Sequence, residues 1–405
     1  MSNHFSSVPD SKWQAKQGGA RGQSKRFAWV FAFALTALGA LSGCSGDKEL
    51  GSPGYVQGFA GGVVTDEPYA ALIGRDVLAA GGSAGDAAAA TYLALSVTKP
   101  ASAGLMAYGY CLDYSVTNQT HRGYRFESPG AVRTMAAIHA RLGVLPWRQV
   151  VGPAEALARF NYKASLAFVN DWRRAALSDP AAQAVFAAGA RVGAQLQQLD
   201  LAALLGQIRE QGGGSVYSGG AARLIWTAAK TAGFQIDEER WRNTLPASGD
   251  ASISRLGDHT LAALPFARSP AGGAENGAES SLVAVDGKGN AVACVFGMGR
   301  PFGSGRLIGG VFFPAAGAPI GTPLLVTNPN TKILLAAIAG GISEATIQQL
   351  AVRTVLDRAP LDQEVKTIPA NAIVCARGLP NYPESCLAAA DPRFDGLAAP
   401  AEPHK

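Results

Sequence analysis

One short segment, residues 279–296, constrains the fold of this chain more than any other. It contains two apolar runs, residues 282–285 and 291–296, separated by Asp-Gly-Lys-Gly-Asn. Glycine and asparagine tolerate the positive φ that a tight reversal needs, so the segment predicts a β-hairpin. Both runs are apolar on both faces, which is typical of central strands in a sheet that is covered on each side. We therefore expect this hairpin at the centre of a covered sheet.

The hairpin resembles the start of the small subunit of γ-glutamyltranspeptidases, which are N-terminal-nucleophile (Ntn) hydrolases. Those enzymes mature by self-cleavage before a Thr in the pattern Thr-Thr-His-x-Ser-Val-Val-Asp-x-x-Gly-Asn-Ala-Val. Asp286 and residues 289–292 match this pattern without a gap, and residues 302–305, Phe-Gly-Ser-Gly, match the motif that follows. Residues 81–90 and 145–158 match further family segments. The resemblance implies an α/β fold of the Ntn-hydrolase type, a four-layer αββα sandwich.

The resemblance breaks down where the family carries its nucleophile. In an ungapped alignment the family's nucleophilic Thr falls on Glu279, its second Thr on Ser280 and its His on Ser281. A shift of one residue places Ser280 at the nucleophile position, with Ser281 as the second candidate. A hydroxyl at a newly cut N-terminus can use its own α-amine as the base. The alternative is that both serines merely begin a strand.

The groups that hold the substrate in the family are also altered. The family Arg that binds the substrate carboxylate falls on Phe126, and Arg125 is one residue away, on the opposite face of a strand. The family's acidic motif is absent, and its serine pair falls on residues 320–321. The nearby hydroxyl residues, Ser304 and Thr322, join Arg125 as substrate-binding candidates. A surface or pairing role for Arg125 is the alternative.

Two glycines, Gly340 and Gly341, lie between a predicted strand, residues 333–338, and a predicted helix, residues 343–356. The resemblance implies that their N–H groups form an oxyanion hole, because the N–H groups at a helix start are unpaired and favour an anion. The alternative is that the two glycines are needed only to turn a strand into a helix.

The remaining pattern is mostly helical. Residues 83–97 predict a helix that starts with a Ser-x-x-Asp capping box and stops before Lys-Pro. Residues 129–158 predict two helices around Leu-Pro-Trp, and residues 160–260 are rich in Ala and Leu at helical spacing. Residues 359–405 are rich in proline and loosely patterned, with a polar tail.

The N-terminal segment predicts export and lipidation. Lys25 and Arg26 precede an apolar run, residues 27–41, and Leu-Ser-Gly-Cys then ends at Cys44. This resembles a bacterial lipobox, in which Cys44 is lipidated and becomes the first residue. The alternatives are a short anchor helix or an ordinary signal peptide. We expect residues 1–44 to be a lipoprotein signal peptide, 45–279 a large-subunit-like region and 280–405 a small-subunit-like region sharing the same sheet core.

Charge and cysteine usage exclude other classes of protein. Residues 1–44 carry five of the 35 Lys and Arg residues but one of the 30 Asp and Glu residues, so the remainder is nearly neutral and predicts no nucleic-acid binding. The histidines are scattered singly, so we expect no metal site and no cofactor. Cys111 and Cys294 are expected as buried small hydrophobic residues. Cys375 and Cys386 are either a disulfide or two free thiols.

Two functional hypotheses follow. The first is a γ-glutamyltranspeptidase-like lipoprotein, anchored to a membrane of the bacterial cell envelope and facing the periplasm, whose transfer and hydrolysis activity is lost or strongly altered. The second is an active, self-processing Ntn amidohydrolase that uses Ser280 through an acyl-enzyme. A small peptide or acyl-amide is the expected ligand in either case. The sequence predicts no particular oligomeric state.

Overall fold

The computed structural model describes residues 59–266, 278–317, 321–340 and 343–402. The predictions made on residues 1–44, including Cys44, and on Gly341 lie outside these ranges. Within them, no helix is both long enough and apolar enough to cross a lipid bilayer.

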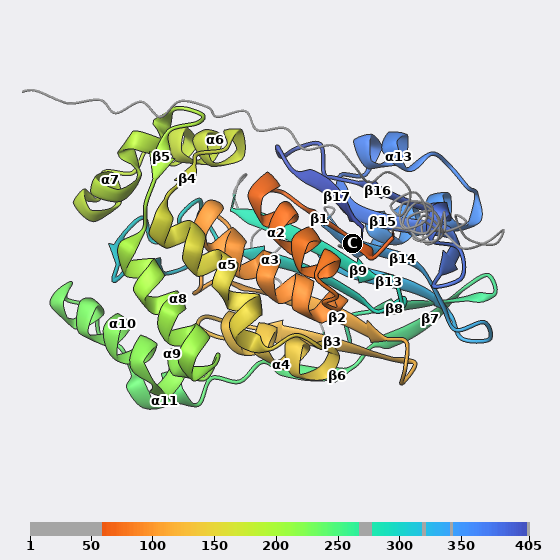
Figure 1. Cartoon of the computed structure of the whole chain (residues 1–405), viewed down its shortest axis with the longest axis horizontal. Helices are drawn as coiled ribbons and strands as arrows, with labels where there is room; N and C mark the ends of the chain where they lie inside the picture. The colour runs from red at the N-terminus through yellow and green to blue at the C-terminus, as the bar shows by residue number, and fades with distance from the viewer. Residues whose placement is uncertain (1–58, 267–277, 318–320, 341–342, 403–405) are drawn as a thin grey trace, which may run out of the picture. The chain divides into compact units, whose positions relative to one another are not determined.

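Two antiparallel sheets form the centre of the fold (Figure 1). The first has seven strands in the order β17-β1-β9-β10-β2-β3-β6, and the second has six in the order β16-β15-β14-β13-β8-β7. The strands of the first sheet are β1 Gly61–Thr65, β2 Tyr108–Ser115, β3 Thr120–Phe126, β6 Ala247–Asp250, β9 Glu279–Asp286, β10 Ala291–Gly297 and β17 Leu397–Ala401. Those of the second are β7 Ser252–Leu256, β8 His259–Ala263, β13 Thr322–Asn328, β14 Ile333–Gly340, β15 Ala370–Leu379 and β16 Cys386–Ala389.

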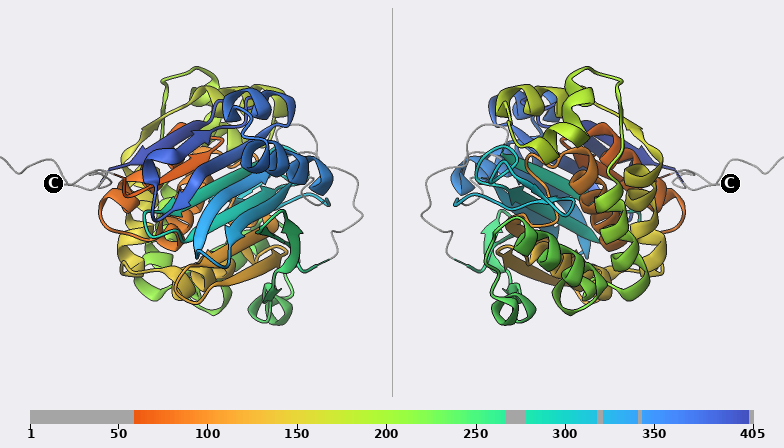
Figure 2. Two further views of the ribbon diagram at one scale, coloured as in Figure 1. Left: turned by 90° about the vertical axis from the view of Figure 1, so that its right-hand side faces the viewer. Right: turned by 90° about the vertical axis from the view of Figure 1, so that its left-hand side faces the viewer.

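Helices cover the outer face of each sheet, as the two side views of Figure 2 show. The seven-stranded sheet is covered by α2 Pro68–Ala79, α3 Ala84–Thr98, α4 Ala131–Leu142 and α5 Trp147–Phe160. The six-stranded sheet is covered by α12 Glu344–Ala351 and α13 Leu361–Thr367, with a π-helical turn, Val352–Leu356, between them. Apolar side chains fill three spaces: under each helical layer and between the sheets. The predicted four-layer αββα sandwich is thus confirmed.

The predicted hairpin is strands β9 and β10, and both strands are buried on both faces. Asp286 organises its turn, because its carboxylate accepts hydrogen bonds from the backbone N–H groups of Lys288 and Asn290, each at 3.0 Å. Gly289 takes a φ of +93°, a backbone conformation that would be strained for a residue with a side chain. The second oxygen of Asp286 accepts from the Ala84 N–H at 3.1 Å, which joins the turn to the start of α3.

The predicted helices around this hairpin are confirmed. Ser83 caps α3 and forms the predicted capping box with Asp86, and α3 ends at the C-cap Lys99. Helices α4 and α5 flank the Leu-Pro-Trp segment as predicted. Further helices extend the outer layer: α6 Leu166–Ala175, α7 Pro180–Phe186, α8 Leu199–Gln211, α9 Ser215–Ser218, α10 Gly220–Thr231 and α11 Glu238–Arg242.

The last part of the chain corrects one expectation. Residues 359–402 are not a loosely patterned tail, because they supply β15, which lies next to β14 inside the six-stranded sheet, and β17, which pairs with β1. The apolar run of β15 is short and flanked by prolines, so the sequence pattern did not predict a strand there. Residues 370–375 of this strand are buried on both faces. Residues 247–263 are likewise strands rather than helix.

The cysteines correct a second expectation. Cys111 and Cys294 are fully buried, as expected, but they form a disulfide rather than two separate thiols. They lie directly opposite each other on β2 and β10, where an antiparallel pair brings side chains close together. Cys375 and Cys386 form the second disulfide, between β15 and β16, so the alternative of two free thiols is wrong.

Candidate functional site

The two candidate nucleophiles point to opposite faces of β9. Ser280 pairs with Phe296 and faces the helical layer, whereas Ser281 pairs with Val295 and faces the space between the sheets. Their side chains are almost entirely inside the protein, since Ser280 is 2% and Ser281 4% exposed. They therefore cannot serve the same cavity, and only one of them faces the second sheet.

A buried carboxylate that the sequence analysis did not identify connects both serines. Asp66 follows β1, the strand that lies beside β9, and it is fully buried. One of its oxygens accepts from the Ser280 hydroxyl at 3.0 Å and from the Ser281 N–H at 2.8 Å. Its other oxygen accepts from the Asn371 side-chain N–H at 2.7 Å. Three donors thus converge on Asp66, which suits a charged acceptor.

Asn371, at the start of β15, links the two sheets at this point. Its side-chain N–H also lies 2.8 Å from the Ser281 hydroxyl, and its carbonyl oxygen accepts from the Asp391 N–H at 2.9 Å. The Ser281 hydroxyl donates to the Ala339 carbonyl of β14 at 3.3 Å. Asp66, Ser281 and Asn371 therefore form one buried polar network that spans both sheets.

The electrostatic environment of this network changes the acidity of Asp66. Burial raises the pKa of Asp66 to about 6, and the negative charge of Asp391 acts in the same direction. The positive charge of Lys99 and the hydrogen bonds from Ser281 and Asn371 lower the pKa and oppose the effect in part. Asp66 therefore has a pKa at which a carboxylate can exchange a proton near neutral pH.

Two further predicted residues lie beside Ser281. Gly340, the last residue of β14, takes a φ of +120°, and a Cβ at this position would lie 3.6 Å from the Ser281 hydroxyl oxygen. Thr322, the first residue of β13, is buried and pairs with Gly340 of β14. The structure thus brings Ser281, Gly340 and Thr322 together at one end of the sheets. Gly341 lies outside the described residues, so the complete oxyanion hole stays a prediction.

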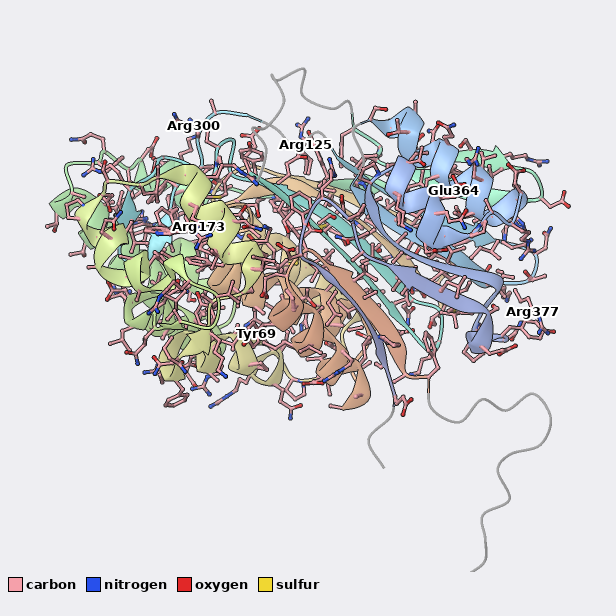
Figure 3. The ribbon with its side chains drawn as sticks, turned by 90° about the horizontal axis from the view of Figure 1, so that it is seen from above. Tyr69, Arg125, Arg173, Arg300, Glu364 and Arg377 are labelled. Atoms are coloured by element: carbon pink, nitrogen blue, oxygen red, sulfur yellow. A yellow bond between two sulfur atoms is a disulfide. The ribbon has the colours of Figure 1, made fainter. Side chains whose placement is uncertain are left out.

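Arg125, which is labelled in Figure 3, lines a separate cavity of about 290 Å³. It shares the face of Ser281 between the sheets, but β2 and β10 lie between the two residues, so they are about 14 Å apart. The Arg125 guanidinium lies over the Phe266 ring at 5.8 Å. Tyr108 also lines this cavity, and its buried hydroxyl lies near Gly299 without completing a hydrogen bond. Among the described residues, neither Arg125 nor Tyr108 forms a hydrogen bond with Ser280 or Ser281.

Ser304 lies elsewhere. It lines a cavity of about 470 Å³ together with Arg174 and Arg300, between the end of α6 and the loop that follows β10. Ser280, Ser281 and Thr322 are not among the residues that line this cavity. The predicted substrate-binding set of Arg125, Ser304 and Thr322 is therefore distributed over three places rather than gathered at one.

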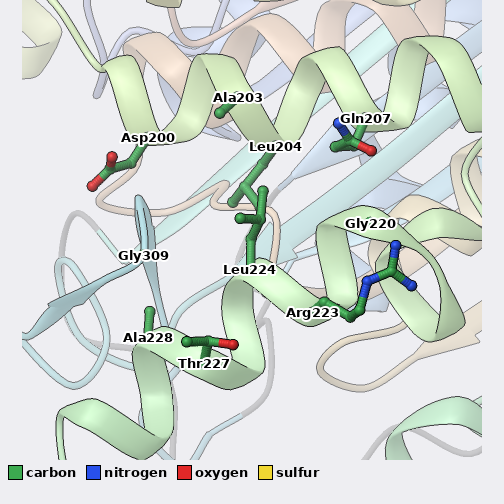
Figure 4. Close-up of a pocket in the computed structure, with 10 residues that line it drawn as sticks. All are labelled: Asp200, Ala203, Leu204, Gln207, Gly220, Arg223, Leu224, Thr227, Ala228 and Gly309. Carbon is green, nitrogen blue, oxygen red and sulfur yellow. The ribbon is translucent and has the colours of Figure 1, made fainter.

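A larger cavity, of about 560 Å³, lies between α8 and α10 (Figure 4). Leu204 and Leu224 meet near its middle, and Asp200 and Arg223 lie toward its two ends. None of the predicted site residues lines it, so its size alone does not identify it as the functional site. No group of acidic, His and Cys residues with the arrangement of a metal site occurs in the ranges that the structure describes.

Sequence reasoning missed the two residues that organise the serines. Asp66 had a detectable pattern, because Thr-Asp-Glu-Pro follows an apolar run and precedes a helix, where a capping acid is common. That pattern suggests a helix cap, and Glu67 is indeed the residue that caps α2. Asn371 had no such pattern, because its strand was not predicted.

Comparisons with known proteins agree with this architecture. A family model described as Gamma-glutamyltranspeptidase matches residues 70–128 and 128–274, which is half of the chain. Glutathione hydrolase 2 of Arabidopsis thaliana is 28% identical over 219 residues, a match that covers 46% of this chain and 37% of that protein. The capsule biosynthesis protein CapD proenzyme of Bacillus anthracis is 31% identical over 186 residues, covering 42% of this chain and 35% of that protein. The chain thus spans little more than a third of the length of these relatives.

A solved structure extends the likeness to nearly the whole fold. Cephalosporin acylase from Bacillus halodurans superposes with a TM-score of 0.70, over 88% of this chain and 100% of that chain. The sequence identity is 17%, so the match concerns the arrangement of layers and strands.

Proposed function

Because the chain belongs to the γ-glutamyltranspeptidase family, we propose that it is a family member that has lost γ-glutamyl transfer and hydrolysis and acts as a binding module. In this proposal the protein is a lipoprotein of the bacterial cell envelope, anchored at Cys44. Residues 1–44 are its signal peptide, and the two disulfides are consistent with an oxidising compartment outside the cytoplasm.

The observation that carries the proposal is the environment of β9. The position aligned with the family nucleophile is occupied by Glu279, which cannot act as the hydroxyl nucleophile of this family. The Ser280 hydroxyl that follows is 2% exposed and hydrogen-bonded to the buried Asp66. β9 pairs with β10 from Glu279 to Val285, so Ser280 lies inside a continuous ladder. An unactivated hydroxyl held in this way is a weak nucleophile.

The substrate-holding groups support the same proposal. Phe126 occupies the position aligned with the family's carboxylate-binding Arg, and its side chain is buried in the helix-facing core. Arg125 faces the other side of β3, at the cavity that Tyr108 also lines. A missing charged partner costs a few kcal/mol of binding, or on the order of 100-fold in affinity per group. A ligand of the small peptide or acyl-amide class is therefore expected to bind without the family's glutamyl contacts.

A second candidate function is favoured by one contact. Asp66 accepts from the Ser280 hydroxyl at 3.0 Å, and a carboxylate with a pKa of about 6 is a suitable general base at neutral pH. In this second proposal Asp66 takes the proton of Ser280 while the Ser280 oxygen attacks the Glu279 carbonyl carbon. The amide bond between Glu279 and Ser280 breaks to give an ester, which water then hydrolyses. The product would be an active Ntn amidohydrolase with Ser280 at a new N-terminus.

The intact mass of the purified mature protein, before and after prolonged incubation, distinguishes the two. A single uncut chain that turns over no γ-glutamyl or acyl-amide substrate supports the binding module. Two fragments with Ser280 at the new N-terminus would overturn it and establish self-cleavage. Ser280→Ala should then abolish the cut, whereas Ser281→Ala, the matched control on the other face of β9, should leave the cut position unchanged.

A further inference from the structure

The loop that follows β10 carries Ser304, a substrate-binding candidate at a cavity that Ser280, Ser281 and Thr322 do not line. Its Phe-Gly-Ser-Gly segment, residues 302–305, lines the 470 Å³ cavity with Arg174 and Arg300. None of the described residues that line this cavity is acidic. We propose that this cavity is a binding site for a phosphate monoester, held by the guanidinium groups of Arg174 and Arg300 and the hydroxyl of Ser304.

The two arginines supply charge that the protein itself does not neutralise fully. Arg300 is exposed and forms no ion pair with any described residue. Arg174 is 3.9 Å from Asp171, a distance at the limit of an ion pair. Asp171 is instead held by Lys99 at 2.6 Å, in a buried pair of which neither side chain is more than 4% exposed. This carboxylate is therefore already paired with Lys99, and the residues that line the cavity include two arginines and no acidic residue.

The loop that carries Arg300 and Ser304 is fixed from behind. Phe302 takes a φ of +60°, which is rare for a bulky residue, and its ring is fully buried. That ring lies 5.1 Å from Phe312 and 5.7 Å from Trp172. The Phe302 and Ser304 N–H groups bond to Ala101 and Phe313 carbonyls. A loop held so firmly loses little conformational freedom on binding a ligand.

The same hydrogen bonds decide which groups are left for a ligand. Within residues 302–305 the N–H groups of Phe302, Gly303, Ser304 and Gly305 all bond to carbonyl groups of the protein. A backbone anion nest of the kind found in phosphate-binding loops is therefore absent from this segment. The Ser304 oxygen accepts from the Arg306 N–H at 3.4 Å, and the Ser304 O–H has no acceptor among the described residues. Side chains, rather than backbone, have to provide recognition.

The class of ligand follows from charge and size. A guanidinium group matches the geometry of phosphate or carboxylate oxygens through two parallel hydrogen bonds. Two arginines match a group with nearly two negative charges, which a phosphate monoester carries at pH 7 and a single carboxylate does not. A volume of about 470 Å³ also holds more than the phosphate itself, so an attached organic group fits. A soluble ester and a lipid headgroup share this chemistry.

The test is calorimetric titration of the mature protein with glycerol 3-phosphate, with acetate as the monoanionic comparison. Because both arginines are partly exposed, we expect Arg300→Gln and Arg174→Gln each to weaken binding about 5-fold, and Ser304→Ala to weaken it less. Arg300→Lys keeps the charge but loses the planar fork, so it should fall between wild type and Arg300→Gln. Arg223→Gln, an exposed arginine at the cavity between α8 and α10, is the matched control and should change nothing.

Vesicles that contain phosphatidic acid distinguish the two sources of the phosphate. Binding to glycerol 3-phosphate that is weakened in the arginine variants supports a soluble ester. Binding to the vesicles alone, weakened in the same variants, supports a lipid headgroup. The proposal is overturned if wild type binds neither probe, if acetate binds as tightly, or if the arginine variants bind as well as wild type.

Discussion

The Asp66 carboxylate accepts a hydrogen bond from the Ser280 hydroxyl at 3.0 Å, although the two residues are 214 positions apart in the chain. The contact is possible because β1 and β9 are neighbours in the seven-stranded sheet. This contact has a different role in each of the two proposed functions. In the binding module Asp66 holds the serine in place, and in the self-processing enzyme it takes the proton of that serine.

Asp66 gives the stability of the protein a defined pH dependence. Its pKa rises from an ordinary value of 3.8 to about 6 on folding, so the folded state binds the proton more tightly. As the pH rises from about 4 to about 6, the free energy of unfolding should therefore fall by on the order of 3 kcal/mol because of this residue. Denaturant unfolding of wild type and Asp66→Asn at several pH values measures the difference. An identical pH dependence in both proteins would contradict the prediction.

His121 should act in the opposite direction. Burial first, and then the positive charge of Arg141, lower its pKa from 6.5 to about 4. Because the folded state disfavours protonated His121, its contribution is present above pH 6.5 and is lost as the pH falls toward 4. Its ring nitrogen lies 3.0 Å from the Thr327 hydroxyl, and its ring stacks on Tyr114. His121→Gln should reduce acid sensitivity in the same unfolding experiment; a steeper loss below pH 6 than in wild type would refute this.

Asn371→Ala should destabilise the protein by about 2–4 kcal/mol. The substitution removes the donor to Asp66 and Ser281 and the acceptor of the Asp391 N–H, and it leaves these buried groups unsatisfied. Asn330→Ala, in an exposed turn, is the control and should stay within about 0.5 kcal/mol of wild type. Equal effects of the two substitutions on the free energy of unfolding would show that the network contributes nothing.

The two disulfides should differ in their contribution to stability. Cys111–Cys294 closes a loop of 183 positions and Cys375–Cys386 one of 11. If restriction of the unfolded chain dominates, the long loop contributes about 2.5 kcal/mol more than the short one. Paired Ala substitutions at each bridge, compared by chemical denaturation, measure this difference. A larger loss from removing Cys375–Cys386 would mean that native-state contacts outweigh chain entropy.

The sequence predicted the parts of the fold that local pattern determines. The β9–β10 hairpin, the capping box of α3 and the two helices around Leu-Pro-Trp depend on residues that are close in the chain. Asn371 and the Cys111–Cys294 bridge depend on which strands become neighbours, and local pattern does not contain that information. The same limit applies to the site: the serines were identified, but the carboxylate that holds Ser280 comes from a distant strand.

Strands β1 and β17, the first and last of the described strands along the chain, are paired, and the Ala60 N–H bonds to the Ala401 carbonyl at 2.8 Å. A short linker can therefore join residues 59 and 402, and the chain can be circularly permuted to begin at Ser280. Removal of the initiator methionine would then give Ser280 a free α-amine without any self-cleavage. Such a permutant separates the question of whether the chain can cut itself from the question of whether the cut chain would be a catalyst.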